Sequence, residues 1–130
     1  RQGYFHYAIF GFAYNDRDNR SSGVAELPGD DFMVTLADYA TPQIMTNTIM
    51  HELGHNLDLE HGGDDPLNWK PNYNSVMNYR YQFAGIDLDL DAMGDGLPGY
   101  SLGISIPLDE SAVIEENGID GQSPIDWDGD

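Results

Sequence analysis

Residues His51–His61, with the sequence HELGHNLDLEH, contain three of the four histidines of the chain. If His51 and His55 lie on one helix, they are about 400° apart in rotation and about 6 Å apart along the axis. Their imidazoles then project from nearly the same face and can reach one metal ion. Neutral imidazole is a good ligand for zinc, and three protein ligands leave a fourth position for water.

Glu52 follows the first of these histidines and is expected to lie beside the ion. A carboxylate next to a metal-bound water can accept its proton, so Glu52 is predicted to be the general base. The pattern HExxH also occurs by chance, but a third histidine at this offset makes the signal specific. We therefore interpret His51, His55 and His61 as zinc ligands. Structural or surface histidines are the alternative interpretation.

The third histidine requires a break in the helix. A helix continued from His55 to His61 would rotate His61 about 240° away from the ligand face and move it about 9 Å along the axis. The helix is therefore expected to stop soon after His55 and to turn back beneath the ion. Glycine is the usual residue for such a stop. Here Asp58 occupies that place, and aspartate enters the left-handed region more readily than most residues.

These residues resemble the signature HExxHxxGxxH of the metzincin metallopeptidases, in which a methionine-containing turn follows further along the chain. Downstream, Ser75–Tyr79 (SVMNY) looks like that Met-turn in the S-x-M-x-Y form of astacin-like and serralysin-like members. The match includes all three ligands, the base and the turn in the right order. The chain departs from the signature at Asp58, where the family has glycine.

The resemblance implies an α+β fold, with a twisted mixed sheet packed on the zinc-binding helix and a loop-rich C-terminal half with a short helix. It implies that Met77 forms an apolar floor under the histidines without binding the metal. It also implies that Tyr79 approaches the zinc and stabilises the tetrahedral intermediate, although a packed aromatic side chain is the alternative. Arg80–Phe83 are expected to shape the pocket for the side chain that follows the cut bond.

The N-terminal part of the chain reads as short strands. Tyr4–Tyr14 is rich in aromatic residues and is predicted to be a buried central strand. Val24–Leu27 and Phe32–Leu36 are predicted to be short strands around Pro28-Gly29. In the resembled family, the last strand before the zinc helix is an edge strand that pairs with an extended substrate. Either of these two segments is the candidate, and a plain sheet edge is the alternative.

The zinc helix is predicted to run from Pro42 to about Leu57. Thr41 is a suitable N-cap, and proline is favoured at the first helical position. Ile49, Leu53 and Leu57 recur at four-residue spacing and form an apolar flank beside the ligands. A second, shorter helix is predicted near Glu110–Asn117.

Two acidic segments are typical of calcium loops, because they alternate carboxylates as hard oxygen-ligand sites do. The first, Asp87–Asp91, also alternates apolar residues, so a half-buried strand explains it without a metal ion. The second is Asp126–Asp130. Calcium is therefore a candidate second cofactor in addition to zinc.

The composition restricts the partners. With 5 basic and 23 acidic residues among 130, the formal net charge is −18, which disfavours nucleic acid and anionic membrane surfaces. There is no cysteine, so thiol catalysis and disulfides are excluded, although the compartment is not decided by this. We expect a single catalytic domain over residues 1–130, shortened at its N-terminus or compact, that acts as a monomer in a secreted or extracellular setting.

The sequence therefore predicts a zinc-dependent endopeptidase that cleaves peptide or protein substrates. Glu52 and Tyr79 are the predicted catalytic residues. The alternative is a zinc-binding domain of the same type with little or no proteolytic activity. The retained Glu52 argues against that alternative, because an inactive site has no need of a general base.

Overall fold

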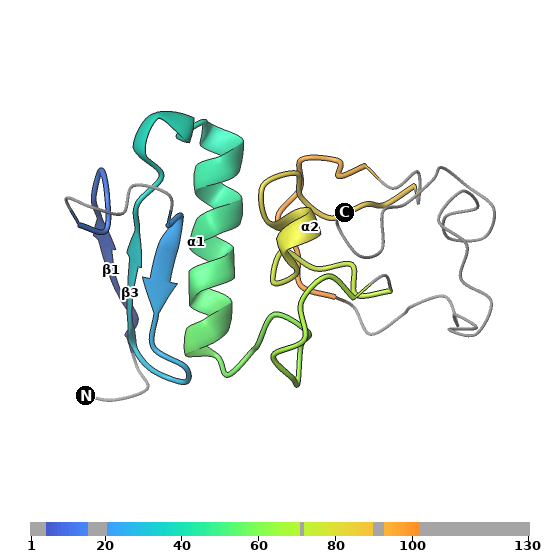
Figure 1. The fold of residues 1–130 in the computed structure, drawn as a ribbon, viewed down its shortest axis with the longest axis horizontal. Coiled ribbons are helices and arrows are strands. Elements are labelled where there is room, and N and C mark those ends of the chain that lie inside the picture. Colours follow the sequence, from blue (N-terminus) through green and yellow to red (C-terminus); the bar gives the residue numbers. More distant parts are fainter. Residues whose placement is uncertain (1–4, 16–20, 71, 90–92, 102–130) are drawn as a thin grey trace.

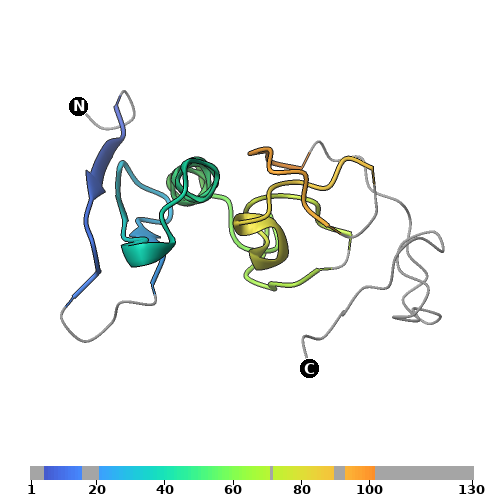
Figure 2. The same cartoon turned by 90° about the horizontal axis from the view of Figure 1, so that it is seen from above.

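The computed structural model describes residues 5–15, 21–70, 72–89 and 93–101. This part of the chain forms a small α+β fold that consists of a three-stranded mixed sheet, a long helix α1 (Pro42–Asn56) and a loop-rich half with the short helix α2 (Tyr79–Gln82). Helix α1 lies between the sheet and the loop-rich half (Figures 1 and 2). The expected α+β class is confirmed. The helix predicted near Glu110–Asn117 lies outside the described residues.

The sheet consists of β1 (Tyr7–Phe10), β2 (Gly23–Ala25) and β3 (Asp31–Val34), in the order β1-β3-β2. Strand β3 is parallel to β1 and antiparallel to β2. The prediction of a buried central strand over Tyr4–Tyr14 is therefore wrong, because β1 is shorter and has only one partner among the described strands. Its side chains are largely exposed, at 68% for Tyr7. Aromatic residues favour a strand, but whether that strand lies at the centre of the sheet depends on its pairing with segments far along the chain.

Among the described strands, β2 is the edge strand next to α1, because β3 pairs with a strand on each side. The candidate Phe32–Leu36 for the substrate-binding edge is therefore excluded, and the candidate Val24–Leu27 corresponds to β2. The Ser22 carbonyl accepts a hydrogen bond from the Thr35 N–H, and the Glu26 N–H donates to the Asp31 carbonyl. Because backbone groups alternate along an antiparallel strand, those of Gly23 and Ala25 point away from β3.

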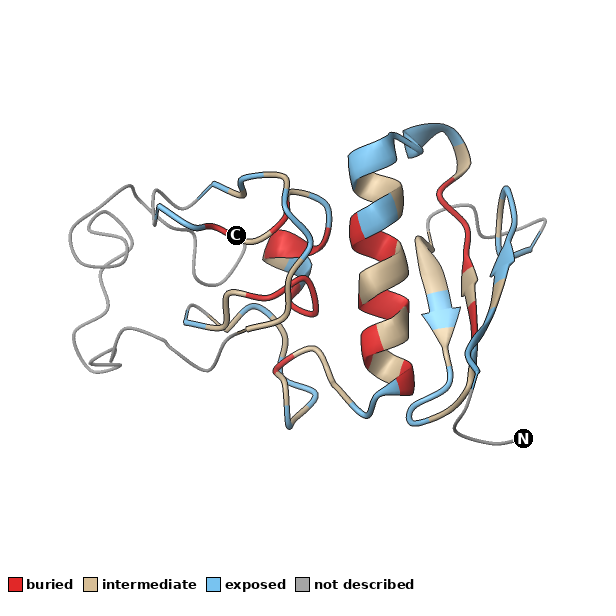
Figure 3. Ribbon diagram, turned by 180° about the vertical axis from the view of Figure 1, so that it is seen from behind, coloured by how far each residue is buried: buried red, intermediate tan, exposed pale blue. Residues whose placement is uncertain are grey.

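The core lies between β3 and α1. The alternation of β3 directs Phe32 and Val34 toward the helix, and Leu36 continues this buried row. Ile44, Met45, Ile49 and Leu53 of α1 pack against it. The predicted apolar flank is thus present as far as Leu53, while Leu57 is exposed. Figure 3 shows buried positions on β3, along α1 and in the segment around α2.

Helix α1 begins as the sequence predicts. Pro42 is its first residue, and the Thr41 side chain accepts a hydrogen bond from the Ile44 N–H at 3.2 Å. A single turn of 3-10 helix, η1 (Ala37–Tyr39), leads into it from β3. No helix in the described part of the chain is long and apolar enough to cross a membrane.

The other end of α1 is fastened to the β2–β3 hairpin by the buried side chain of Asn56. Its amide nitrogen donates to the backbone carbonyls of Glu26 and Asp31, both at 3.0 Å. These bonds link α1 to the residues that flank the hairpin turn. They therefore fix the distance between the helix and the edge strand β2.

Candidate metal centre

The helix break that the third histidine requires occurs at Asp58. This residue has a φ of 71°, in the left-handed region. The Leu59 N–H donates to the Gly54 carbonyl at 2.9 Å, and the Asp58 N–H donates to the His55 carbonyl at 3.0 Å. This pair of bonds is a Schellman motif, in which the left-handed residue usually is glycine. The predicted stop is therefore confirmed, with aspartate in the glycine position.

His61 lies at the tip of a tight turn that follows the break. Glu60 and Gly63 exchange backbone hydrogen bonds of 2.9 and 3.0 Å across this turn, and Gly63 has a φ of 97°. The two successive reversals return the chain toward the helix. As a result, the His61 ring lies 5.4 Å from the His51 ring and 4.9 Å from the His55 ring, between centroids.

The three histidines form one group of possible metal ligands, whose ligand atoms all lie within 4.8 Å of one another. The Nε2 atoms of His51 and His55 are 3.2 Å apart. Two nitrogens bound to a tetrahedral zinc ion at its usual bond length lie about 3.3 Å apart. The predicted ligands are therefore brought together, and the spacing of the His51 and His55 nitrogens fits a zinc ion.

Backbone carbonyls fix the orientation of two of these rings. His51 donates from Nδ1 to the Val76 carbonyl at 2.7 Å, and His55 donates from Nδ1 to the Leu59 carbonyl at 2.8 Å. A carbonyl only accepts, so both Nδ1 atoms carry the proton and both Nε2 atoms carry lone pairs. The contact between the two Nε2 atoms is thus between two acceptors, an arrangement that a shared cation would stabilise.

Burial keeps these rings neutral. It lowers the pKa of His51 from its ordinary value to about 3, against the opposing effect of the Val76 carbonyl and with further lowering by His55 and His61. Burial also lowers the pKa of His55 and of His61. Neutral imidazole is the form that binds a metal ion.

Glu52 is almost fully buried, with 3% of its surface exposed, and it lines the same cavity as the histidines. Burial raises the pKa of its carboxyl to about 8. The carboxyl lies against the backbone of β2, where a Cβ at Gly23 would overlap its Oε1 atom. Because Gly23 has no side chain, the Glu52 carboxyl has room to lie beside the edge strand. No signal in the sequence revealed this role of Gly23.

The predicted Met-turn lies directly beneath the histidines. Val76 and Met77 are fully buried, and the Val76 carbonyl is the one that orients His51. The Met77 sulfur packs against Gly54, where a Cβ would overlap it. Glycine at this position of α1 allows the turn to approach the helix between two of the ligands. Met77 thus occupies the place expected for an apolar floor.

Tyr79, the first residue of α2, borders the group of three histidines. Its ring centroid is 4.4 Å from that of His61 and 5.8 Å from that of His51. Burial raises the pKa of its phenol, and the Glu52 carboxylate raises it further. The phenol therefore stays protonated and can donate a hydrogen bond at neutral pH.

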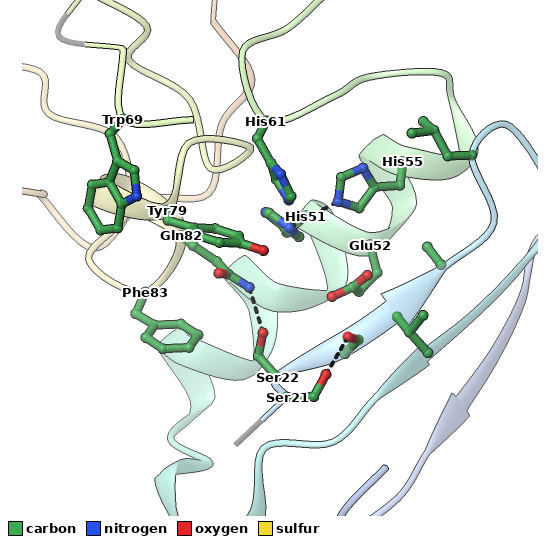
Figure 4. A pocket seen from close by; sticks show the side chains of 14 residues that line it. Ser21, Ser22, His51, Glu52, His55, His61, Trp69, Tyr79, Gln82 and Phe83 are labelled. Atoms are coloured by element: carbon green, nitrogen blue, oxygen red, sulfur yellow. Dashed lines mark hydrogen bonds between the residues drawn. The ribbon is translucent and has the colours of Figure 1, made fainter. Parts of the chain in front are cut away.

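The three histidines, Glu52 and Tyr79 line one cavity of about 680 Å³ between β2, α1 and α2 (Figure 4). Of the segment predicted to shape the pocket, Gln82 and Phe83 line this cavity, whereas Arg80 and Tyr81 do not. The sequence analysis did not assign a role to several other lining residues, which lie at or just before the start of β2 and in the loop before the Met-turn: Ser21, Ser22, Gly23 and Trp69.

Of the acidic segment Asp87–Asp91, the structure describes Asp87, Leu88 and Asp89. Asp87 is buried and lies in one group with the exposed Asp89 and Asp95. Such groups are common without a cation, so calcium receives no assignment here. Leu88 is exposed and only Ile86 forms a bridge, so the described part of the segment is not a half-buried strand. Asp126–Asp130 lies outside the described residues.

Comparison of the chain with protein-family models, with curated proteins and with solved structures finds no match. The geometry of the chain itself therefore carries the assignment. It defines a group of three histidines on and after a helix, compatible with a zinc site, in a small α+β fold.

Proposed function

We propose that this protein is a metzincin-like zinc endopeptidase. The observation that carries this proposal is the pair of Nε2 lone pairs of His51 and His55, held 3.2 Å apart by backbone carbonyls, with His61 completing the group. Structural histidines would pair their nitrogens with hydrogen-bond donors rather than point lone pairs at one another. A cleft that also contains a buried carboxylate adds the second requirement for hydrolysis.

His51, His55 and His61 would hold a zinc ion, which would supply the acidification of a bound water molecule and the polarisation of a substrate carbonyl. Glu52 accepts the proton of the attacking water and passes it to the leaving amine. Without a metal ion, burial raises the pKa of Glu52 to about 8, which leaves the carboxyl largely protonated at neutral pH. A nearby cation shifts the carboxyl back toward its charged form.

The edge strand β2 offers a place for the substrate backbone. The backbone groups of Gly23 and Ala25 point away from β3, and both residues line the cavity. An extended peptide can add to such an edge through main-chain hydrogen bonds. This brings its scissile carbonyl toward Glu52, which lies against Gly23. The side chain that follows the cut bond would then face Gln82 and Phe83.

Tyr79 supplies a donor for the charge that develops on the carbonyl oxygen. Its phenol is protonated at neutral pH and its ring borders the metal group. A hydrogen bond from a donor that is already in position is stronger in a site from which water is excluded. Tyr79 is partly exposed and lines the cavity, whereas an aromatic side chain that serves only in packing would be mostly buried.

Hydrolysis of an unstructured protein, measured with and without a zinc chelator, tests the proposal. We expect cleavage that the chelator abolishes, that zinc restores and that Glu52→Ala lowers by about three orders of magnitude while zinc remains bound. Zinc binding without any cleavage by the unaltered chain would instead favour the alternative of a non-proteolytic zinc-binding domain. Activity that survives Glu52→Ala would refute the mechanism.

A further inference from the structure

One side chain, Asn68, joins the loop before the Met-turn to the beginning of α2. Its Oδ1 atom accepts hydrogen bonds from two backbone N–H groups, that of Trp69 at 2.9 Å and that of Tyr79 at 3.0 Å. Both partners are donors, so the amide oxygen rather than the nitrogen faces them. An amide oxygen has two lone pairs, and both are used here.

The Tyr79 N–H has no partner within its own helix. It belongs to the first turn of α2, where N–H groups lack carbonyls in the preceding turn. Asn78 caps the next donor, the Arg80 N–H, at 3.2 Å. The two asparagines thus divide the first donors of α2 between them, and Asn68 takes the donor of the residue whose ring borders the metal group.

The other bond of Asn68 holds a strained residue. Trp69 has a φ of 61°, a left-handed conformation that is rare for an aromatic residue. Its ring stands edge-on to the Tyr79 ring at 6.2 Å between centroids, on the cavity wall. Strain of this kind persists only where the surroundings hold it, and it gathers at functional sites. In Figure 4 the Tyr79 ring lies between Trp69 and the three histidines.

We propose that Asn68 is a positioning residue that sets the Tyr79 phenol at the metal centre by fixing the backbone at both Trp69 and Tyr79. This inference rests on the proposed function for its catalytic consequence. A backbone shift at Tyr79 is carried to its hydroxyl, at the far end of the ring. A misplacement of about 1 Å in such a group costs up to about 100-fold in rate.

A double-mutant cycle tests this coupling. We expect Asn68→Ala to lower kcat roughly fivefold to tenfold, and Asn68→Asp, which keeps an acceptor oxygen, to restore most of it. Tyr79→Phe is expected to lower kcat about 100-fold. In the Tyr79→Phe background, Asn68→Ala should then cause no further loss. An equal loss in both backgrounds would overturn the proposal, because Asn68 would then act through Trp69 or through general stability.

Asn72→Ala is the matched control, because Asn72 is an exposed asparagine of the same loop and lies outside this cavity. It should leave kcat and zinc affinity unchanged. A second readout does not need activity. The ring resonances of Tyr79, identified by their loss in Tyr79→Phe, should be displaced by the neighbouring rings in the unaltered chain and in Asn68→Asp, and should move toward free-tyrosine values in Asn68→Ala. Unchanged resonances would overturn the positioning role even if the chain proved not to cleave peptides.

Discussion

Asp58 forms the break in the metal-binding helix, and a series of replacements there measures how much the site depends on that turn. The residue has a φ of 71°. A left-handed conformation costs most L-residues about 1–2 kcal/mol, and aspartate somewhat less. Glycine removes this cost but adds about 0.4–1 kcal/mol of chain entropy to the unfolded state. Asp58→Gly is therefore expected to stabilise the metal-free protein by 0 to about 1 kcal/mol.

Asp58→Val should have the opposite effect, because a β-branched side chain is among the least tolerant of this conformation. We expect a loss of about 2 kcal/mol, or a fall in Tm of roughly 8 °C for a domain of this size. The turn also places the Leu59 carbonyl 2.8 Å from Nδ1 of His55. Loss of such a partner lowers metal affinity by about 10- to 100-fold, so Asp58→Val should bind zinc more weakly by a factor in that range.

Asp58→Asn is the matched control, because asparagine keeps the shape and the tolerance of the left-handed region without the charge. Thermal unfolding of the metal-free variants and zinc titration against a chromogenic chelator give the two readouts. We expect Asp58→Gly and Asp58→Asn to bind zinc as tightly as the unaltered chain, and Asp58→Val to bind it much more weakly. A tenfold or greater loss of affinity in Asp58→Gly would refute the reasoning, since the side chain would then have a role beyond the turn.

Three further predictions follow from the site. Burial raises the pKa of Glu52 from 4.5 to about 8, so the folded state keeps a proton that the unfolded state releases, and stability falls as pH rises between these values. In chelator-treated protein, Glu52→Gln should remove this pH dependence, so the free energy of unfolding at pH 7, measured by urea unfolding, should rise by an amount on the order of 3 kcal/mol. The same pH dependence of stability in the variant and the unaltered chain would contradict this expectation. Gly54→Ala should cost about 1–3 kcal/mol and weaken zinc binding, because the new methyl group overlaps the Met77 sulfur; unchanged Tm and zinc affinity would argue against the Met77 floor. Because the net charge is −18, kcat/KM for a cationic peptide should fall with added salt and that for an anionic peptide should rise; identical salt profiles would exclude steering by charge.

The elements with local signals could be predicted from the sequence. Thr41 and Pro42 specify the start of α1 through their own side chains, and the cap is formed as expected. The histidine spacing determines which ligands share a helix face, and the same geometry requires the break at Asp58. Each of these conclusions depends on residues a few positions apart. Chain geometry alone is enough for them.

Features that depend on distant segments could not be predicted in this way. The place of β1 at a sheet edge is decided by its pairing with β3, which composition does not encode. Gly23 meets Glu52, and Asn68 meets Tyr79, only after the chain has folded. The carbonyls of Val76 and Leu59 orient the ligands through the backbone, so their side chains carry no signature of that role.

The zinc content of the purified protein, determined by elemental analysis after dialysis against metal-free buffer, shows whether the three histidines form a metal centre. Convergence of His51, His55 and His61, with the Nε2 atoms of His51 and His55 3.2 Å apart, predicts one zinc ion per chain. A protein without zinc that cannot be loaded with it, or one that contains calcium alone, would contradict the assignment of these histidines as a metal centre.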